Sequence, residues 1–281
     1  MKKVLDPHGI EVTVKCRIGA DDVDSYDDLK NFVETVSQSG VTHFIVHARK
    51  CWLNGLSPKQ NRTIPPLKYH WIAQLSLEFP HLRISLNGGI QSMSHSQKLL
   101  QLASHSGEDH VPAKVEELKQ ILTGMENDSS YDDRLDLTFL PHSKGNDLSS
   151  VPGLFDSMMI GREAFGHPWM FSTVDSKFFG VPDPNLTRRE VIERYIRYAE
   201  NLAENKSQSG YSMYGSAKPN ALCKPLLRFF AGHIGSGAFR KRINESINEL
   251  KMSDIRSVVL GALEEISQEV LDCRPSLTVD N

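Results

Sequence analysis

The stretch from Phe44 to Pro66, FIVHARKCWLNGLSPKQNRTIPP, decides how the first part of the chain folds. It opens with a short apolar run from Phe44 to His47, and the cations Arg49 and Lys50 follow at once. A loop rich in Gly, Pro, Asn and cations completes the stretch. An apolar strand that carries polar groups at its carboxyl end is typical of α/β sheets, which place their chemistry at that edge.

The same pattern recurs on both sides of this stretch. Further strands are predicted at Val12 to Ile18, Leu82 to Leu86 and Asp156 to Ile160. Amphipathic helices are predicted between them: one after a capping box at Ser25 and Asp28, one from about Tyr69 to Phe79, and one from near Ser94. This alternation predicts right-handed crossovers and a parallel sheet. A TIM-type (β/α)8 barrel has eight strands, so four correspond to half of one.

An acidic segment interrupts the pattern between the last two predicted strands. Residues 101–150 hold ten acidic and four basic residues, a net charge of −6. Apart from a helical-looking piece from Pro112 to Leu122, the segment is rich in Ser, Asp and Gly. We expect an insertion that is largely loop or disordered.

From Leu186 the chain changes to a helical pattern. Thr187 can cap a helix, and later helices are predicted at Ala217–Ala231, Ala238–Leu250 and Ser253–Val270. Residues 186–250 contain eleven basic and six acidic residues, net +5, which suits a polyanionic substrate. We therefore predict two domains, a partial β/α barrel at 1–180 and a helical domain at 181–281. The buried face of the first helix is predicted to hold Val191, Ile192, Tyr195, Ala199 and Leu202.

Composition narrows the functional classes. The net charge of −3 argues against a chain that binds nucleic acid over its whole surface. Four scattered cysteines without a CxxC motif argue against a zinc site or a disulfide scaffold and fit a reducing compartment. We expect no metal and no membrane span, because no apolar run reaches about 18 residues, and MKKVLDPHG lacks the apolar core of a secretory signal. A monomer in the cytoplasm is expected, with an organelle as the alternative.

Two glycine-containing strand ends predict a phosphate site. Asn87, Gly88 and Gly89 follow one strand, and Gly161 and Arg162 follow the next. Glycines let backbone N–H groups approach a phosphate closely, and the last two loops of a β/α barrel frequently share such a site. Asn-Gly-Gly alone fits a tight turn equally well, but the pair of strand ends favours a phosphate-bearing cofactor.

Cations and a histidine are predicted at the same edge. The alternation in VTVKCRI puts Lys15 and Arg17 on one strand face, where buried charges need partners. Their partner is either an internal carboxylate or an anionic cofactor, and we favour the cofactor. His47 beside Arg49 and Lys50 is expected to contact a ligand, while Lys59 and Arg62 are loop cations. GHIGSG at Gly232 to Gly237 follows a helix, which favours an interhelical turn over a nucleotide loop.

Four blocks in this order, VTVKCRIG, FIVHARKCWLNGLSPKQNRTIPPL, FPHLRISLNGG and MMIGREAFGHPW, resemble the tRNA-dihydrouridine synthases, in particular their type A subgroup. The similarity runs from about Val12 to Ile90 and from Phe155 to about Asn244. Residues 101 to about 150 do not match. The resemblance implies the second half of a (β/α)8 barrel, followed by a C-terminal helical domain that grips tRNA.

The resemblance also implies an activity. These enzymes are FMN flavoproteins that reduce the C5=C6 bond of a D-loop uridine in tRNA, with NADPH as reductant. By position, Lys15 and His47 would lie against the flavin or the target uracil. The FMN phosphate would be held by Asn87, Gly88, Gly89, Gly161 and Arg162. Arg49, Lys50, Lys59, Arg62, Arg240 and Lys241 would contact tRNA.

One departure from the family concerns catalysis. The family uses a cysteine after the fourth barrel strand as proton donor, and the match begins at what would be the fifth strand. Cys16, Cys51, Cys223 and Cys273 do not stand at that position, so no catalytic residue is assigned here and we expect this chain alone to be poorly stable or inactive. The alternatives are an inactive remnant that still binds tRNA and another FMN-dependent barrel oxidoreductase that acts on a small molecule.

Overall fold

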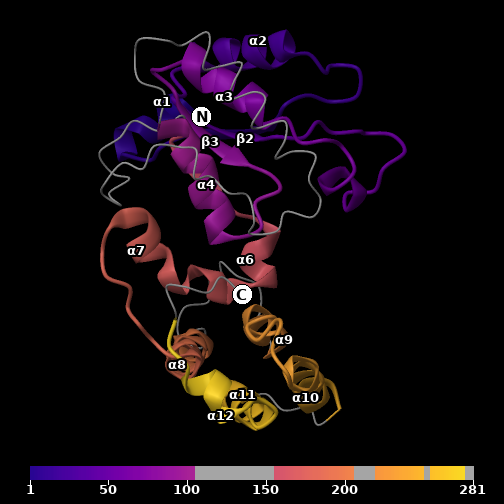
Figure 1. The fold of residues 1–281 in the computed structure, drawn as a ribbon, viewed down its shortest axis with the longest axis vertical. Helices are drawn as coiled ribbons and strands as arrows, with labels where there is room; N and C mark the ends of the chain where they lie inside the picture. The colour runs from indigo at the N-terminus through magenta and orange to yellow at the C-terminus, as the bar shows by residue number, and fades with distance from the viewer. Residues whose placement is uncertain (105–154, 206–218, 250–253, 276–281) are drawn as a thin grey trace. The chain divides into compact units, whose positions relative to one another are not determined.

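The computed structural model describes residues 1–104, 155–205, 219–249 and 254–275 (Figure 1). The chain forms two compact units, Met1–Gly161 and Arg162–Asn281. The units divide at Gly161, earlier than the boundary predicted at residue 180. The assignment of one function to each domain stays a prediction. Apart from the end of a helix at residues 101–104, the predicted insertion lies outside the described residues.

Four parallel strands form the sheet of the first unit, in the order β1-β2-β3-β4. This confirms the parallel sheet expected of half a β/α barrel. The bounds are β1 Thr13–Arg17, β2 His43–His47, β3 Arg83–Asn87 and β4 Ser157–Met159. The register aligns Arg17, His47, Asn87 and Met159 in one row at the carboxyl ends of the strands. The row that contains Lys15 continues through Ile45, Ser85 and Ser157.

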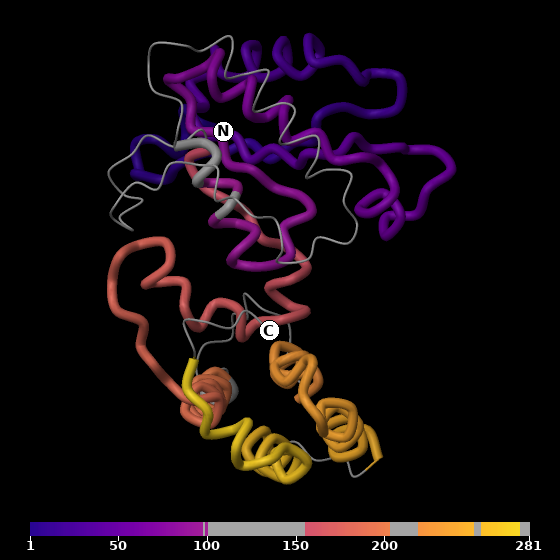
Figure 2. Tube along the Cα trace, in the orientation of Figure 1, coloured from indigo at the N-terminus to yellow at the C-terminus, as the bar shows by residue number. Residues whose placement is uncertain are grey.

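A helix follows each of the first three strands, as the tube in Figure 2 traces. These helices are α2 Tyr26–Ser37, α3 Tyr69–Glu78 and α4 Met93–Ser104, close to the predicted positions. The predicted capping box is confirmed, because Ser25 Oγ accepts from the Asp28 amide and the Asp28 carboxylate accepts from the Ser25 amide. Short helical segments lie elsewhere in this unit at α1 Lys2–Leu5, η1 Asp6–His8 and η2 Gln60–Arg62.

The two faces of the sheet differ in chemistry. Phe44, Val46, Ile84 and Leu86 point into one core with apolar residues of α2, α3 and α4, including Leu29, Val33, Ile72, Leu75 and Leu99. Because side chains alternate along a strand, the opposite face carries the polar residues. Their hydrogen bonds run across the strands: His43 bonds to Ser85 at 2.7 Å, and Ser85 bonds to Ser157 at 2.6 Å.

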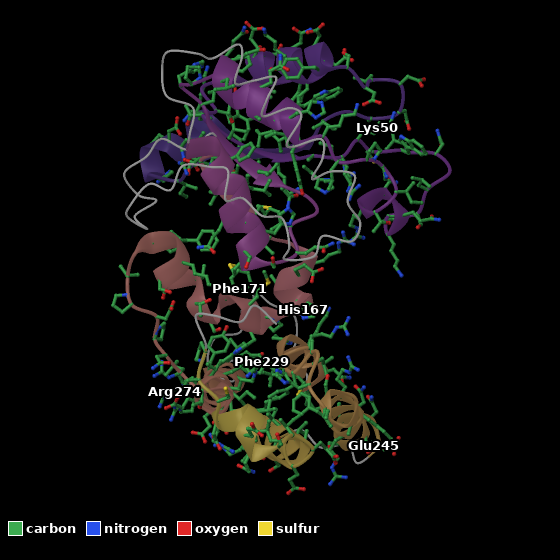
Figure 3. The ribbon with its side chains drawn as sticks, in the orientation of Figure 1. Lys50, His167, Phe171, Phe229, Glu245 and Arg274 are labelled. Atoms are coloured by element: carbon green, nitrogen blue, oxygen red, sulfur yellow. The ribbon has the colours of Figure 1, made fainter. Side chains whose placement is uncertain are left out.

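The second unit is helical. Its α-helices are α6 Arg162–Gly166, α7 Val174–Phe179, α8 Arg188–Asn205, α9 Pro219–Cys223, α10 Ser236–Asn248, α11 Ile255–Leu263 and α12 Gln268–Asp272. Two 3-10 segments, η4 Pro168–Thr173 and η5 Lys224–Leu226, join them. An apolar core formed by α8 to α12 includes Phe229 (Figure 3), whose ring meets Phe230 edge to face. No helix in the described ranges is both long and apolar enough to cross a bilayer.

Sequence-based boundaries succeed for α8 and fail for two other helices. Thr187 caps α8 as predicted, with Glu190 accepting from the Thr187 amide at 2.7 Å, and Ile192 and Ala199 are buried. The helix predicted at 217–231 is wrong as one element, because α9 ends at Cys223 and η5 begins at Lys224, next to Pro225, which lacks an amide proton. The helix predicted at 253–270 is also wrong, since it ends at Leu263 and Ser267 caps a separate α12. Gly232 to Gly235 form the predicted interhelical turn before α10.

Candidate functional site: the carboxyl ends of the strands

Two consecutive glycines in the left-handed region follow β3. Gly88 has φ +109° and Gly89 has φ +70°, values that other residues adopt at a cost. A Cβ on Gly88 would lie 2.7 Å from His47 Cδ2, and a Cβ on Gly89 would lie 2.6 Å from Leu67 Cδ1. Backbone conformation and space therefore both require glycine at these positions.

Hydrogen bonds hold this turn in place. The Tyr69 hydroxyl donates to the Gly88 carbonyl at 2.6 Å in a buried position. Asn87 Nδ2 donates to the Met159 carbonyl at 2.7 Å, which ties the end of β3 to the end of β4. The Ala48 amide donates to the Asn87 carbonyl, so β2 is joined to the same turn. The structure thus brings His47, Asn87 and Gly88 together, as the sequence predicted.

Lys15 lies on the polar face of β1 but is exposed, which corrects the expectation of a buried cation. Partial burial and the neighbouring Arg17 lower the pKa of Lys15. Within the described ranges no carboxylate forms an ion pair with it, so the internal-carboxylate alternative has no support there. Gly161 is also exposed and has open space where a Cβ would stand, and Arg162 follows it directly.

Arg17 has a different role from the one expected. Its Nη1 donates to the carbonyls of Lys50 at 2.8 Å and Asn61 at 3.0 Å, so the guanidinium joins β1 to two points of the loop after β2. Burial lowers the pKa of Arg17. The sequence predicted an anion as the partner of Arg17, whereas the structure shows two backbone carbonyls.

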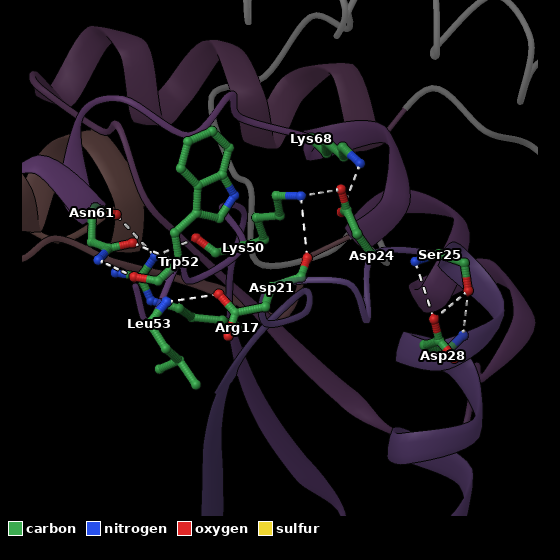
Figure 4. A network of polar contacts seen from close by, with 10 residues as sticks. All are labelled: Arg17, Asp21, Asp24, Ser25, Asp28, Lys50, Trp52, Leu53, Asn61 and Lys68. Carbon is green, nitrogen blue, oxygen red and sulfur yellow. Dashed lines mark hydrogen bonds and ion pairs between the residues drawn. The ribbon is translucent and has the colours of Figure 1, made fainter. Parts of the chain in front are cut away.

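Asn61 is the centre of that loop. Its side chain is buried, donates to the carbonyls of Trp52 at 2.7 Å and Leu56 at 3.3 Å, and accepts from the Trp52 amide at 2.8 Å (Figure 4). A buried amide that satisfies three backbone groups fixes the shape of the loop, since each group would otherwise be left unpaired.

Asp24 anchors two lysines beside this loop. Lys50 Nζ lies 2.7 Å and Lys68 Nζ lies 3.1 Å from its carboxylate oxygens (Figure 4). Burial acts to raise the pKa of Asp24, but the hydrogen bonds and charges of Lys50 and Lys68 outweigh it and hold the pKa below its ordinary value. Lys68 also stacks on Trp71, with Nζ 3.8 Å from the ring centroid.

The cations predicted to contact tRNA fall into two groups. Arg49 donates to the Pro65 carbonyl and Lys50 is paired with Asp24, so both are engaged inside the first unit. Lys59 is exposed, and so is Arg62, whose Nε donates to the Pro58 carbonyl at 2.8 Å. In the second unit, Lys241 on α10 is 78% exposed and lies 3.6 Å from Glu245, which Figure 3 labels. Arg240, its neighbour on α10, is partly exposed.

Comparison with known proteins shows which family the chain with this site resembles. A family model described as dihydrouridine synthase matches residues 1–113, which include the first three strands and the Gly88–Gly89 turn. The chain is a dihydrouridine synthase homologue. It is 33% identical over 271 residues to a tRNA-dihydrouridine(20/20a) synthase of Vibrio vulnificus, covering 96% of this chain and 63% of that protein.

Other relatives agree. Proteins with the same name from Shewanella oneidensis and a Synechocystis strain are each 32% identical, over 89% and 88% of this homologue. The homologue spans 63%, 55% and 54% of the lengths of these three relatives. The similarity therefore includes both units of the dihydrouridine synthase homologue, and confirms the family resemblance seen in the sequence.

The four cysteines of this homologue are free. Burial raises the pKa of Cys16 and of Cys223 to about 11, Cys51 is half-buried and Cys273 is exposed. Among the residues with described positions, no group of three or more His, Cys, Asp or Glu could hold a metal ion. Sequence reasoning missed Asn61, Asp24 and Tyr69, because each acts on residues brought close only by folding.

Proposed function

We propose that this chain supplies the FMN-phosphate-binding strand ends and the RNA-binding helices of an enzyme that reduces a D-loop uridine of tRNA to 5,6-dihydrouridine, with NADPH as reductant. The observation that carries the proposal is the Gly88–Gly89 turn beside His47, on a sheet whose polar face presents Lys15. The curated relatives are named for this reaction, and they are longer than the chain, so the activity of the whole protein is inferred from them.

The residues fit a phosphorylated cofactor. Left-handed glycines turn backbone N–H groups toward an anion, and Gly161 leaves open space at the adjoining strand end. Arg162, next in sequence, would add a guanidinium that binds two phosphate oxygens. In this proposal Asn87, Gly88, Gly89, Gly161 and Arg162 hold the phosphate of FMN.

The chemistry divides between cofactor and protein. FMN, when bound, supplies a hydride donor for one carbon of the uracil double bond, and the other carbon requires a proton. The Lys15 ammonium is exposed on the sheet face and would stabilise negative charge that develops on the pyrimidine or cofactor. His47, fixed against Gly88, would contact the same ligand through its ring nitrogens. The target uracil must leave its stack to reach such a site.

The second unit supports an RNA substrate over a small molecule. Residues 186–250 carry a net charge of +5, and Arg240 and Lys241 lie on one turn of α10. A small substrate needs no basic helical unit, whereas tRNA presents phosphates that such cations neutralise. Lys59 and Arg62 are the exposed candidates in the first unit, and Arg49 and Lys50 position the loop that carries them.

The test separates the proposal from its two alternatives. Purified protein is examined for flavin absorbance, and unmodified tRNA is incubated with it and NADPH before nucleoside analysis by mass spectrometry. The proposal expects bound FMN and a mass increase of two hydrogens on a D-loop uridine. Binding of the same tRNA is measured by gel shift. Flavin without tRNA binding would favour a small-molecule oxidoreductase, and tRNA binding without flavin would favour a remnant.

A further inference from the structure

The first part of the loop after β2 presents two adjacent large apolar side chains to solvent. Trp52 is 37% exposed and Leu53 is 69% exposed, and only Cys51 separates them from the cations Arg49 and Lys50. Single exposed apolar residues are common on proteins. A tryptophan and a leucine side by side in a polar loop need a further observation to indicate a binding role.

That observation is how firmly the loop is held. The Trp52 amide and carbonyl both bond to Asn61, the Leu53 amide donates to Asp21 Oδ1 at 2.8 Å, and the Lys50 carbonyl accepts from Arg17 (Figure 4). Backbone groups of Lys50, Trp52 and Leu53 are thus fixed by the buried Asn61 of the same loop and by two half-buried side chains from outside it, Arg17 and Asp21. The indole is therefore presented on a rigid support, and ligand binding would order little more of the loop.

Charge around the indole fits a polyanion. From Thr35 to Leu77 the chain contains five Lys or Arg and no Asp or Glu. The carboxylates that reach this stretch, Asp21 and Asp24, are engaged with the Leu53 amide and with Lys50 and Lys68. Lys50 Nζ lies 5.4 Å from the centroid of the Trp52 ring, and exposed Lys59 and Arg62 belong to the same loop. Aromatic rings interleaved with cations are how proteins bind unpaired nucleotides, because every base can stack on a ring while the cations neutralise phosphates.

We propose that Trp52 is a stacking platform for an unpaired nucleobase of the RNA substrate, beside Lys59 and Arg62, which contact its phosphates. The inference rests on the proposed function, since it names the way in which the first unit holds RNA. It makes Trp52 a substrate-binding residue, and it makes Asn61 a positioning residue that acts through the Trp52 backbone.

The test compares the parent chain with Trp52→Phe, which keeps a ring, and Trp52→Leu, which keeps apolar surface without one. Binding of a labelled tRNA transcript is measured at several salt concentrations. We expect Trp52→Leu to weaken binding about tenfold and Trp52→Phe to stay within about threefold. The dependence on salt should stay the same, because no cation is lost. A fully paired RNA duplex should bind the parent and Trp52→Leu equally.

Tryptophan fluorescence provides a readout that does not depend on how well Trp52→Leu folds. The parent and Trp52→Phe share Trp71 and Trp169, so the difference in quenching on adding tRNA reports Trp52 alone. If Trp52 stacks on a base, adding tRNA should strongly quench the tryptophan fluorescence of the parent, and this quenching should be absent in Trp52→Phe. If the parent and both variants bind tRNA with equal affinity, and the parent and Trp52→Phe show equal quenching, the inference is overturned. The proposed function would still stand in that case. A parent chain that does not bind tRNA would overturn both.

Discussion

Three cations around the loop after β2 of the first unit and the cations on α10 of the second unit are used differently. Arg17, Lys50 and Lys68 each have a partner atom in the protein within about 3.1 Å. Lys241 is 78% exposed, and its contact with Glu245 is 3.6 Å long. A count of positive charges in the sequence would not distinguish these two groups of cations. The contacts show that the first set shapes a loop, while Lys241 stays largely exposed, as the proposed RNA contact requires.

The largest effect is expected at the turn on which the strand ends depend. Gly88→Ala would place a methyl group 2.7 Å from the His47 ring at φ +109°. We expect the free energy of unfolding to fall by about 2–4 kcal/mol, from backbone strain and overpacking together, as measured by urea denaturation.

Gly161→Ala is the matched control, because its Cβ would meet nothing within 4 Å. It should change stability by less than about 0.5 kcal/mol. Equal stability of the two variants would contradict the close approach of Gly88 to His47.

The second effect tests the rigid loop. Asn61→Ala would leave the amide of Trp52 and the carbonyls of Trp52 and Leu56 without their partner. We expect a loss of about 2–3 kcal/mol in the free energy of unfolding, since these groups lose a buried partner. Asn54→Ala, at an exposed position of the same loop, should be close to neutral. If the two asparagines cost the same, Asn61 does not organise the loop.

The third effect concerns RNA rather than stability. The double variant Arg240→Ala, Lys241→Ala should lower tRNA affinity about tenfold at moderate salt and reduce the slope of log affinity against log salt by about one to two. Its thermal melting should match that of the parent.

Arg256→Ala is the control, because Arg256 is held by an ion pair with Glu200 at 2.7 Å. It should leave the salt slope unchanged. If the salt slope changed in Arg256→Ala and stayed the same in the α10 double variant, the assignment of RNA contacts to the α10 cations would be contradicted.

The smallest effect is a pH dependence from Asp24. Its pKa is depressed in the folded chain, so its contribution to stability is present above the unfolded pKa of about 3.9 and is lost as pH falls through the folded pKa. Exposed and half-exposed ion pairs contribute about 1 kcal/mol or less. In Asp24→Asn the free energy of unfolding should therefore fall less on acidification than in the parent, by about that amount. An unchanged acid profile would show that Lys50 and Lys68 do not stabilise the carboxylate.

Local patterns in the sequence predicted much of this fold. The capping boxes at Ser25 and Thr187 act between residues three apart, and strand alternation along VTVKCRI acts between adjacent residues. The Gly88–Gly89 turn could be predicted because glycine itself signals the backbone conformation. These features need no knowledge of what lies across the fold.

What the sequence could not supply depends on distant partners. Arg17 reaches carbonyls 33 and 44 residues away, and Asp24 meets lysines 26 and 44 residues away. A cation in a strand gives no sign of whether its partner is an anion or a carbonyl. The break after Leu263 is a different case, because Ser267 caps α12 by accepting from the Val270 amide only three residues on. Here a local capping signal was present in the sequence, and the prediction of one long helix overlooked it.

The most direct test of the account compares FMN with riboflavin, which lacks the phosphate. Binding of each to the purified protein is measured by flavin fluorescence quenching, for the parent and for Arg162→Ala. The account predicts that the parent prefers FMN by about tenfold or more, and that Arg162→Ala reduces this preference while riboflavin binding is unchanged. Equal affinity of the parent for FMN and riboflavin would contradict the assignment of these strand ends to a phosphate.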